Sequence, residues 1–288
     1  MLRASLLFTV IFSMLTANAS SRPPQNVAFY YGNEAPIGAL YAYDWVVLQQ
    51  DQATNARIDL LKRGGTKPLS YISIGEIAKS HRFFREVPEQ WKLGTNPAWK
   101  SVVFDLRKPE VLNFILDRLI APALERGFDG LFMDTLDSHL LTPEGKATPA
   151  AFAQSQALLL EEIHNRYPDV TIIINRGFHL PESAHSVVDA LAFESWRAGY
   201  HAGQKRYGEV SEPDRDWLNQ QLDHWRGSHP EVPLIAIDYV AEGRSAAAHA
   251  EQLRTEGFIP YVSNGDLNRL GPTHPETRKR HVLVVHDL

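Results

Sequence analysis

Four acidic residues stand where apolar stretches of this sequence end. Glu76, Asp134, Glu194 and Asp238 each close a run of hydrophobic residues, and Asp137 follows three positions after Asp134. Carboxylates that lie close together push their pKa values apart, so that one holds a proton while another is ionised. Such a pair can protonate a leaving oxygen and act on an anomeric carbon. The pattern therefore predicts cleavage of a glycosidic bond by two of these carboxylates.

Aromatic, amide and basic side chains accompany the acids and are predicted to line a substrate pocket. Sugar rings stack on aromatic faces, and tyrosine hydroxyls can hydrogen-bond to sugar hydroxyls. Asn175 and Arg176 end a further apolar run, where they could hydrogen-bond to a substrate. Besides Glu76, Asp137 and Asp238, the predicted pocket residues are Tyr30, Tyr31, Tyr71, Asn175, Arg176, Trp196, Tyr239 and Asn264.

The segments that must position these residues alternate between strands and helices. Continuous apolar runs are typical of strands that are covered on both faces. They occur at Val27–Tyr31, Trp45–Gln49, Leu69–Ile74, Gly130–Asp134, Thr171–Asn175, Ala190–Glu194, Leu234–Asp238 and Phe258–Val262. Helical patterns lie between them at Asn55–Arg63, Pro109–Arg126, Ala150–Arg166, Asp216–Arg226 and Ala246–Thr255.

Eight strands in this order predict an α/β fold, a single-domain (β/α)8 TIM barrel, in which the carboxyl ends of all strands surround one pocket. A doubly wound sheet would require a glycine-rich phosphate turn after the first strand. The residues at that point, Tyr31-Gly32-Asn33-Glu34, do not form one. The stretch Ala78–Ser101 is predicted to be an extended loop after the third strand. Asp129 precedes its strand and is expected at the opposite end of the barrel, in a structural role.

Composition excludes several other classes of protein. The formal charge of -5 argues against a nucleic-acid partner. The chain has no cysteine, which removes disulfides, thiolate nucleophiles and cysteine metal sites. The sequence contains no P-loop, no G-x-S-x-G nucleophile elbow and no HExxH metal motif. No metal and no cofactor is therefore expected.

The first nineteen residues have the organisation of a signal peptide. Arg3 supplies the positive charge, Leu6–Leu15 the apolar core, and Ala17-Asn18-Ala19 the small-residue cleavage site. The apolar core is too short for a lasting membrane anchor, so no stable membrane insertion is expected. The pattern predicts an exported protein, periplasmic or secreted after cleavage near Ala19, with a barrel domain over residues 20–288.

Four motifs in this order resemble those of glycoside hydrolase family 114 and of the related PelA-type hydrolase domain, family 166. The resemblance extends from about Val27 to Asn264. The motifs are Tyr71-Ile72-Ser73-Ile74-Gly75-Glu76, Gly127-Phe128-Asp129-Gly130-Leu131-Phe132-Met133-Asp134 with Asp137, Asn175-Arg176-Gly177 and Phe193-Glu194-Ser195.

The resemblance implies a cofactor-free TIM barrel that cleaves α-1,4-linked galactosamine or N-acetylgalactosamine polymers internally, as in a Pel-like biofilm exopolysaccharide. It implies that Asp134 is the nucleophile and Glu194 the general acid/base, while Glu76, Asp137, Asn175 and Asp238 line the subsites. The resemblance also implies two partners, a polysaccharide substrate and an exopolysaccharide-export machinery. The spacing of the two carboxyl groups would distinguish a retaining from an inverting mechanism.

Two other classes of protein stay open. A metal-dependent barrel enzyme would use strand-end acids to bind Mg²⁺, together with a Lys or His base, and would be sensitive to a chelator. No strand end supplies a lysine, and Lys79 lies in a loop. A carbohydrate-binding barrel without catalysis would bind polymer equally well after Asp134→Asn and Glu194→Gln.

Overall fold

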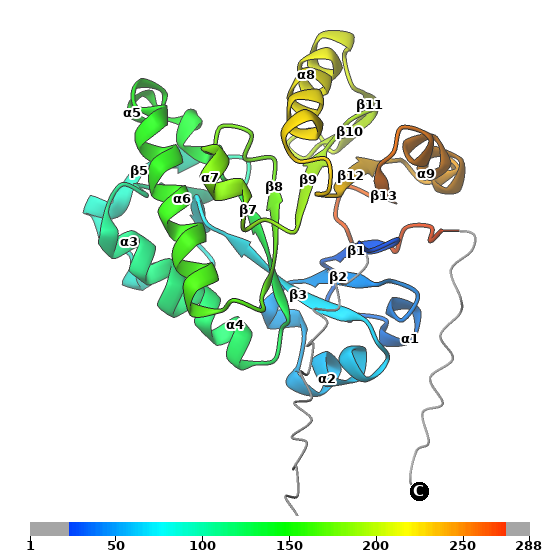
Figure 1. The fold of residues 1–288 in the computed structure, drawn as a ribbon, viewed down its shortest axis with the longest axis horizontal. Helices are drawn as coiled ribbons and strands as arrows, with labels where there is room; N and C mark the ends of the chain where they lie inside the picture. Colours follow the sequence, from blue (N-terminus) through cyan, green and yellow to red (C-terminus); the bar gives the residue numbers. More distant parts are fainter. Residues whose placement is uncertain (1–22, 275–288) are drawn as a thin grey trace, which may run out of the picture.

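Eight parallel strands form the centre of the molecule. The computed structural model describes residues 23–274 (Figure 1). Within the sheet the strands follow the chain order β1-β2-β3-β7-β8-β9-β12-β13. Their bounds are β1 (Val27–Tyr30), β2 (Trp45–Leu48), β3 (Lys67–Ser73), β7 (Gly130–Asp134), β8 (Thr171–Asn175), β9 (Ala190–Glu194), β12 (Leu234–Tyr239) and β13 (Ile259–Ser263).

The first and last strands approach each other, so the sheet is a nearly closed barrel. The ring of Phe29 on β1 packs on that of Tyr261 on β13, with centroids 5.6 Å apart. Beyond β1, the backbone N–H of Tyr31 donates to the carbonyl of Leu267 over 2.7 Å. The predicted (β/α)8 fold is confirmed, and all eight predicted strands are present, with ends that shift by at most two residues.

Burial explains why the sequences of the strands are continuous apolar runs. Every residue of β1, β2, β8 and β12 is buried. One face of each strand fills the barrel interior and the other is covered by helices, so neither face can be polar. Polar side chains are therefore concentrated at the strand ends.

Helices of very different lengths surround the barrel (Figure 1). Four begin with a side chain that accepts a backbone N–H: Thr54 before α2, Thr142 before α5, Ser211 before α8 and Ser245 before α9. After β8 the outer layer has only one helical turn, α7. The bounds are α1 (Ile37–Leu40), α2 (Asn55–Arg63), α5 (Pro143–Ala147), α6 (Pro149–Arg166), α7 (Glu182–His185), α8 (Glu212–Ser228) and α9 (Ala246–Thr255).

The helix predicted over Pro109–Arg126 is present but is not regular. It consists of α3 (Pro109–Phe114), a π-helical segment (Ile115–Ile120) and α4 (Ala121–Glu125). Pro122 has no N–H to donate to the carbonyl one turn earlier, and its ring crowds that carbonyl. The wider π spacing accommodates this defect just before the proline.

The segment predicted as a long loop after the third strand contains a small antiparallel sheet. Its strands are β4 (Glu76–Ala78), β5 (Lys92–Asn96) and β6 (Ser101–Phe104), in the order β4-β6-β5. A second excursion after β9 forms the hairpin of β10 (Ala198–His201) and β11 (Arg206–Glu209). Short 3-10 turns occupy Gln50–Gln52, Phe84–Glu86, Glu89–Trp91 and Ser138–Leu141.

Some sequence predictions concern residues outside those described. The signal peptide and its cleavage near Ala19 lie there. Within residues 23–274, none of the helices combines the length and the apolar character needed to cross a membrane.

Candidate active site

Three adjacent barrel strands end in polar side chains that meet at one rim. Asp134 is the last residue of β7, Asn175 of β8 and Glu194 of β9. Neighbouring parallel strands bring their carboxyl ends to the same end of a barrel. Because β8 lies between β7 and β9, Asn175 stands between the two carboxylates.

The side-chain amide of Asn175 donates to both carboxylates. Its Nδ2 lies 2.8 Å from Oδ1 of Asp134 and 2.7 Å from Oε1 of Glu194. These two oxygens are therefore separated by at most the sum of those distances. The Oδ1 atom of Asn175 is buried and has no hydrogen-bond partner within residues 23–274, so it can accept a hydrogen bond from a bound molecule.

Two tyrosines, one buried and one partly buried, fix the other oxygen of each carboxylate. The hydroxyl of Tyr71, on β3, donates to Oδ2 of Asp134 over 2.8 Å, and that of Tyr239, on β12, donates to Oε2 of Glu194. Burial raises the pKa of both phenols well above 10.0, so they remain protonated donors. The ring of Tyr31 packs edge-on against Tyr71 with centroids 5.2 Å apart. Each carboxylate is thus held in one orientation.

The backbone turns in the same way after each of these three strand ends. Thr135, Arg176 and Ser195 have φ angles of 65°, 60° and 61°. Residues with a side chain seldom occupy this left-handed region, and a β-branched threonine is especially strained there. The Thr135 side chain compensates by accepting from the backbone N–H of Gly75 over 2.9 Å. A side chain at Gly75 would clash with the Thr135 carbonyl.

Asp134 holds a proton more tightly than an isolated aspartic acid does. Burial, and next the negative charge of Glu194, raise the pKa of Asp134 from 3.8 to about 6. The hydrogen bonds from Asn175 and Tyr71 oppose this rise because they stabilise the ionised form. Because two negative charges this close repel each other, the pair keeps one proton below about pH 6. One carboxyl group can then donate a proton while the other is ionised.

This proton gives a pH dependence with a defined sign. We expect kcat/KM to fall as the pH rises through about 6, because the pair then loses its single proton. In Asn175→Ala the opposing hydrogen bond is lost, and the alkaline limb should move to higher pH. The raised pKa also contributes stability that is full below pH 3.8 and is lost as the pH rises through about 6. Initial rates across pH check the prediction, and an alkaline limb that does not move in Asn175→Ala contradicts it.

Glu76, predicted to line the pocket, lies in a polar network that the small sheet forms with the turn after β7. One of its oxygens accepts from Asn96 Nδ2 over 2.9 Å and from Ser138 Oγ over 2.5 Å, and the other accepts from the Ser101 hydroxyl. Only 4% of Glu76 is exposed. The carboxylate therefore ties β4 to β5, to β6 and to the turn after β7.

Asp238, also predicted to contact substrate, is fully buried behind Glu194. Its carboxylate accepts three consecutive backbone N–H groups, from Trp196, Arg197 and Ala198, over 2.7, 3.0 and 3.1 Å. It also accepts from Nε2 of His249 over 2.7 Å. The side chain therefore holds the turn that follows Glu194. Sequence analysis did not single out His249, which has no motif around it and is marked only by its position beside buried Ala250 on α9.

Three other predicted pocket residues have structural contacts of their own. Trp196 is buried, packs on Phe258 and donates its Nε1–H to Asn219 over 2.7 Å. The hydroxyl of Tyr30 donates to the carbonyl of Glu34 over 3.0 Å. Asn264 bonds to Asn268 through both its Nδ2 and its Oδ1.

The remaining two predicted residues, Arg176 and Asp137, lie between Asp134 and Glu194 in the sequence. The guanidinium of Arg176 reaches the carbonyl of Glu194 over 3.4 Å, next to the pair. Asp137 is exposed at the start of the turn after β7. The residues that the structure gathers around the two carboxylates are thus Asn175, Arg176, Tyr31, Tyr71 and Tyr239.

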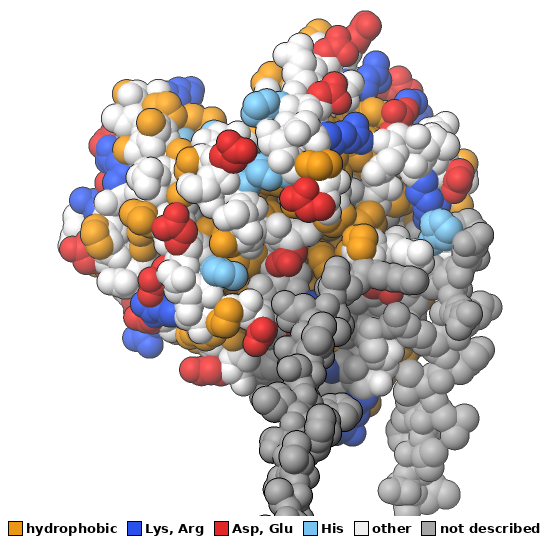
Figure 2. Space-filling model, viewed as in Figure 1, with side chains coloured by type: hydrophobic (Ala, Val, Ile, Leu, Met, Phe, Trp, Pro, Cys, Tyr) orange, Lys and Arg blue, Asp and Glu red, His pale blue; other side chains and the backbone are white. Residues whose placement is uncertain are grey.

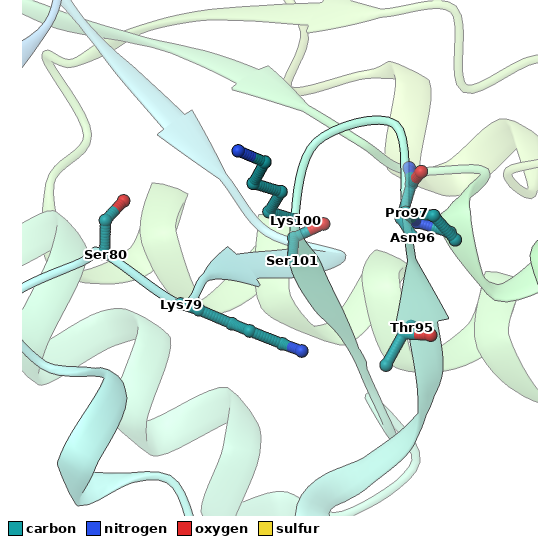
Figure 3. Close-up of a pocket in the computed structure, with 7 residues that line it drawn as sticks. All are labelled: Lys79, Ser80, Thr95, Asn96, Pro97, Lys100 and Ser101. Atoms are coloured by element: carbon teal, nitrogen blue, oxygen red, sulfur yellow. The ribbon is translucent and has the colours of Figure 1, made fainter. Parts of the chain in front are cut away.

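A separate open depression of about 560 Å³ lies beside the small sheet (Figure 3). Lys79 follows β4 and extends toward Thr95 on β5, while Lys100 lies at the β5–β6 turn (Figure 3). Neither Asp134 nor Glu194 lines it. Among the residues that the structure describes, there is no group of three or more His, Asp or Glu side chains arranged to hold a metal ion.

Comparison with known proteins agrees with this geometry. The sequence profile of glycoside hydrolase family 114 matches residues 13–279, which is most of the chain. The chain belongs to glycoside hydrolase family 114. The sequence resemblance to this family is thereby confirmed, and the protein is a glycoside hydrolase by family.

Solved structures include relatives of this family 114 chain. The glycoside hydrolase domain of PelA from Pseudomonas aeruginosa is 35% identical, with a TM-score of 0.80 over 87% of this chain and 98% of that one. Ega3 from Aspergillus fumigatus, in complex with galactosamine, shares the fold with 16% identity and a TM-score of 0.65, over 86% of this chain and 94% of that one.

A curated relative is an uncharacterised protein of Methanocaldococcus jannaschii, 24% identical in an alignment of 232 residues that covers 73% of this chain and 64% of that protein. The family 114 chain thus spans slightly less than two thirds of that relative's length.

Proposed function

We propose that the protein is an endo-acting hydrolase of α-1,4-linked galactosamine or N-acetylgalactosamine polysaccharide, working by a two-carboxylate retaining mechanism. One observation carries the proposal: a single amide nitrogen, Nδ2 of Asn175, binds both Asp134 and Glu194. A glycosidase needs two carboxyl groups at a fixed separation, with one of them protonated. The bridge and the raised pKa of Asp134 support both requirements.

The spacing of the pair favours retention over inversion. The bridged oxygens lie no farther apart than the sum of 2.8 and 2.7 Å. Carboxyl groups of retaining enzymes are separated by about 5–5.5 Å, whereas inverting enzymes need about 6.5–9.5 Å to admit a water molecule. This upper bound matches the retaining separation and falls below the inverting one, which supports retention.

The proposed steps use the pair in turn. Glu194 donates its proton to the glycosidic oxygen while Asp134 attacks the anomeric carbon and forms a glycosyl ester. Glu194 then removes a proton from water, which cleaves the ester and restores both groups. The single shared proton must lie on Glu194 when the glycosidic oxygen approaches. The proton can lie on either Asp134 or Glu194, and the first step requires the form in which it lies on Glu194.

The choice of polymer rests on the relatives and on charge. PelA and Ega3 are the structural relatives, and the Ega3 structure contains galactosamine. Ionised carboxyl groups at the rim suit a polymer that carries free ammonium groups. Export across a membrane, to the periplasm or outside the cell, and contact with an exopolysaccharide-export machinery belong to the same proposal.

Product analysis tests the function. The protein is incubated with partly deacetylated α-1,4-galactosaminogalactan, and with chitosan as the control polymer. We expect a ladder of galactosamine oligosaccharides by mass spectrometry and, by NMR, new reducing ends that appear first as the α anomer. Initial release of the β anomer contradicts retention, and the absence of any oligosaccharide contradicts the function.

A further inference from the structure

A small pocket lies between α7 and α8, on the outside of the barrel. Its volume is about 130 Å³. It is separate from the active site, because none of Asp134, Asn175 and Glu194 lines it. The one-turn helix α7 covers less of the barrel than a full helix would, which leaves room beside α8 (Figure 1). The pocket is lined by Phe178, Leu180, Glu182, His185, Gln221, His224, Trp225, Ser228 and His229.

Three side chains that line this pocket each carry a polar atom without a hydrogen bond to the described residues. Nε1 of Trp225, Nε2 of His185 and Nε2 of His229 are all buried without a hydrogen bond to residues 23–274. Trp225 is 2% exposed and His185 8%. Buried polar atoms are almost always hydrogen-bonded, so three such atoms at one pocket call for a partner from outside the chain.

The chemistry of these atoms limits the kind of partner. His185 donates its other ring N–H to the backbone of Gly177, and burial lowers its pKa to about 4, so the ring is neutral at physiological pH. Its Nε2 therefore offers a lone pair. The indole Nε1–H of Trp225 can only donate. A hydroxyl group is the simplest ligand group that accepts from one of these atoms and donates to the other.

Aromatic side chains extend from the pocket to the surface. Phe178 lines the pocket and meets Trp217 edge-on, with centroids 6.2 Å apart and an angle of 84°. Trp217 lies on α8 and is 48% exposed. Histidine side chains also reach the surface beside α8 (Figure 2). Exposed aromatic rings beside hydroxyl-binding groups are the combination that sugars require.

We propose that the pocket between α7 and α8 is a second carbohydrate site, which binds one sugar unit of a polysaccharide chain. His185 and Trp225 hold a hydroxyl of that unit, and Trp217 stacks on the unit outside it. The polymer identity rests on the proposed function. The site would keep the enzyme on its substrate between cleavage events, because a polymer held at two points dissociates more slowly.

Binding to polymer tests this site separately from catalysis. The full-length protein carries Glu194→Gln throughout, so that polymer is not consumed, and affinity is measured by electrophoresis through gels containing α-1,4-galactosaminogalactan. Trp217→Ala should weaken retention about tenfold, and Gln221→Ala at the pocket wall should weaken it less. The control is Trp99→Ala, another exposed tryptophan (64%) in the turn between β5 and β6, which should bind as the parent does.

The outcomes separate the two proposals. Equal retention of Trp217→Ala and its parent overturns the second site, as does an equal loss in Trp99→Ala. In a competition experiment, free galactosamine should displace the polymer from the protein only when the galactosamine concentration is high. Displacement by a low concentration of galactosamine would indicate a site for the free sugar. If the active protein cleaves no galactosamine polymer, but Trp217→Ala loses retention on another polysaccharide, the proposed function fails and the second site stands.

Discussion

Replacing Glu194 by glutamine should lower kcat/KM on the polymer by a factor on the order of 10³ or more. The amide cannot protonate the glycosidic oxygen or activate water. It also changes the contact with Asn175, whose Nδ2 now binds a carboxylate oxygen. Initial rates of reducing-end release measure the loss. The fold should be preserved, because glutamine has nearly the same shape.

The control for this variant lies at the opposite end of the barrel. Asp129 precedes β7 and pairs with Lys62 over 2.7 Å at the surface. Asp129→Asn should therefore retain the parent rate. A rate in Glu194→Gln within tenfold of the parent would mean that Glu194 is not the acid. Another group would then transfer the proton.

Replacing Asp238 by alanine should lower the free energy of unfolding by about 3–5 kcal/mol. The carboxylate is fully buried and accepts three backbone N–H groups as well as His249 Nε2. Without it these donors are buried and unpaired. Activity should also fall, because the released turn begins at Ser195, directly after Glu194. Denaturant unfolding followed by tryptophan fluorescence measures the change.

A matched variant separates the parts of this effect. Asp238→Asn keeps the shape and one acceptor oxygen, so its loss of stability should be smaller than that of the alanine variant. Glu242→Ala, an exposed carboxylate a few residues further on, should have stability within about 0.5 kcal/mol of the parent. A direct contact between Asp238 and substrate would instead give Asp238→Ala parental stability and a raised KM.

The barrel could be predicted from sequence because its strands are buried on both faces. Runs such as Thr171–Asn175 and Gly130–Asp134 are apolar up to a polar last residue, and the structure places their ends where the pattern does. Short segments were harder to predict. β10 and β11 have four residues each and are partly exposed, so no hydrophobic period marks them. The π-helical segment depends on a proline within an otherwise regular helical pattern.

The sequence predicted only part of the roles of the strand-end acids. A carboxylate that faces substrate and one that binds backbone N–H groups both follow an apolar run. Asp134 and Asp238 therefore look alike in sequence. In the structure, Asp134 lies beside Glu194 and has a raised pKa, whereas Asp238 is enclosed by the turn after Glu194. The difference comes from residues far away in the chain. Asn96, Ser101 and Ser138 enclose Glu76 in the same way.

The left-handed residues after β7, β8 and β9 have a consequence for transplanting this chemistry into other barrels. Asp134, Asn175 and Glu194 are each followed by a residue with φ near 60°, so their aim depends on the next peptide unit as well as on the strand. Grafting the three side chains alone onto another scaffold would therefore leave their orientation undefined. The smallest transferable unit is a set of three dipeptides: Asp134-Thr135, Asn175-Arg176 and Glu194-Ser195.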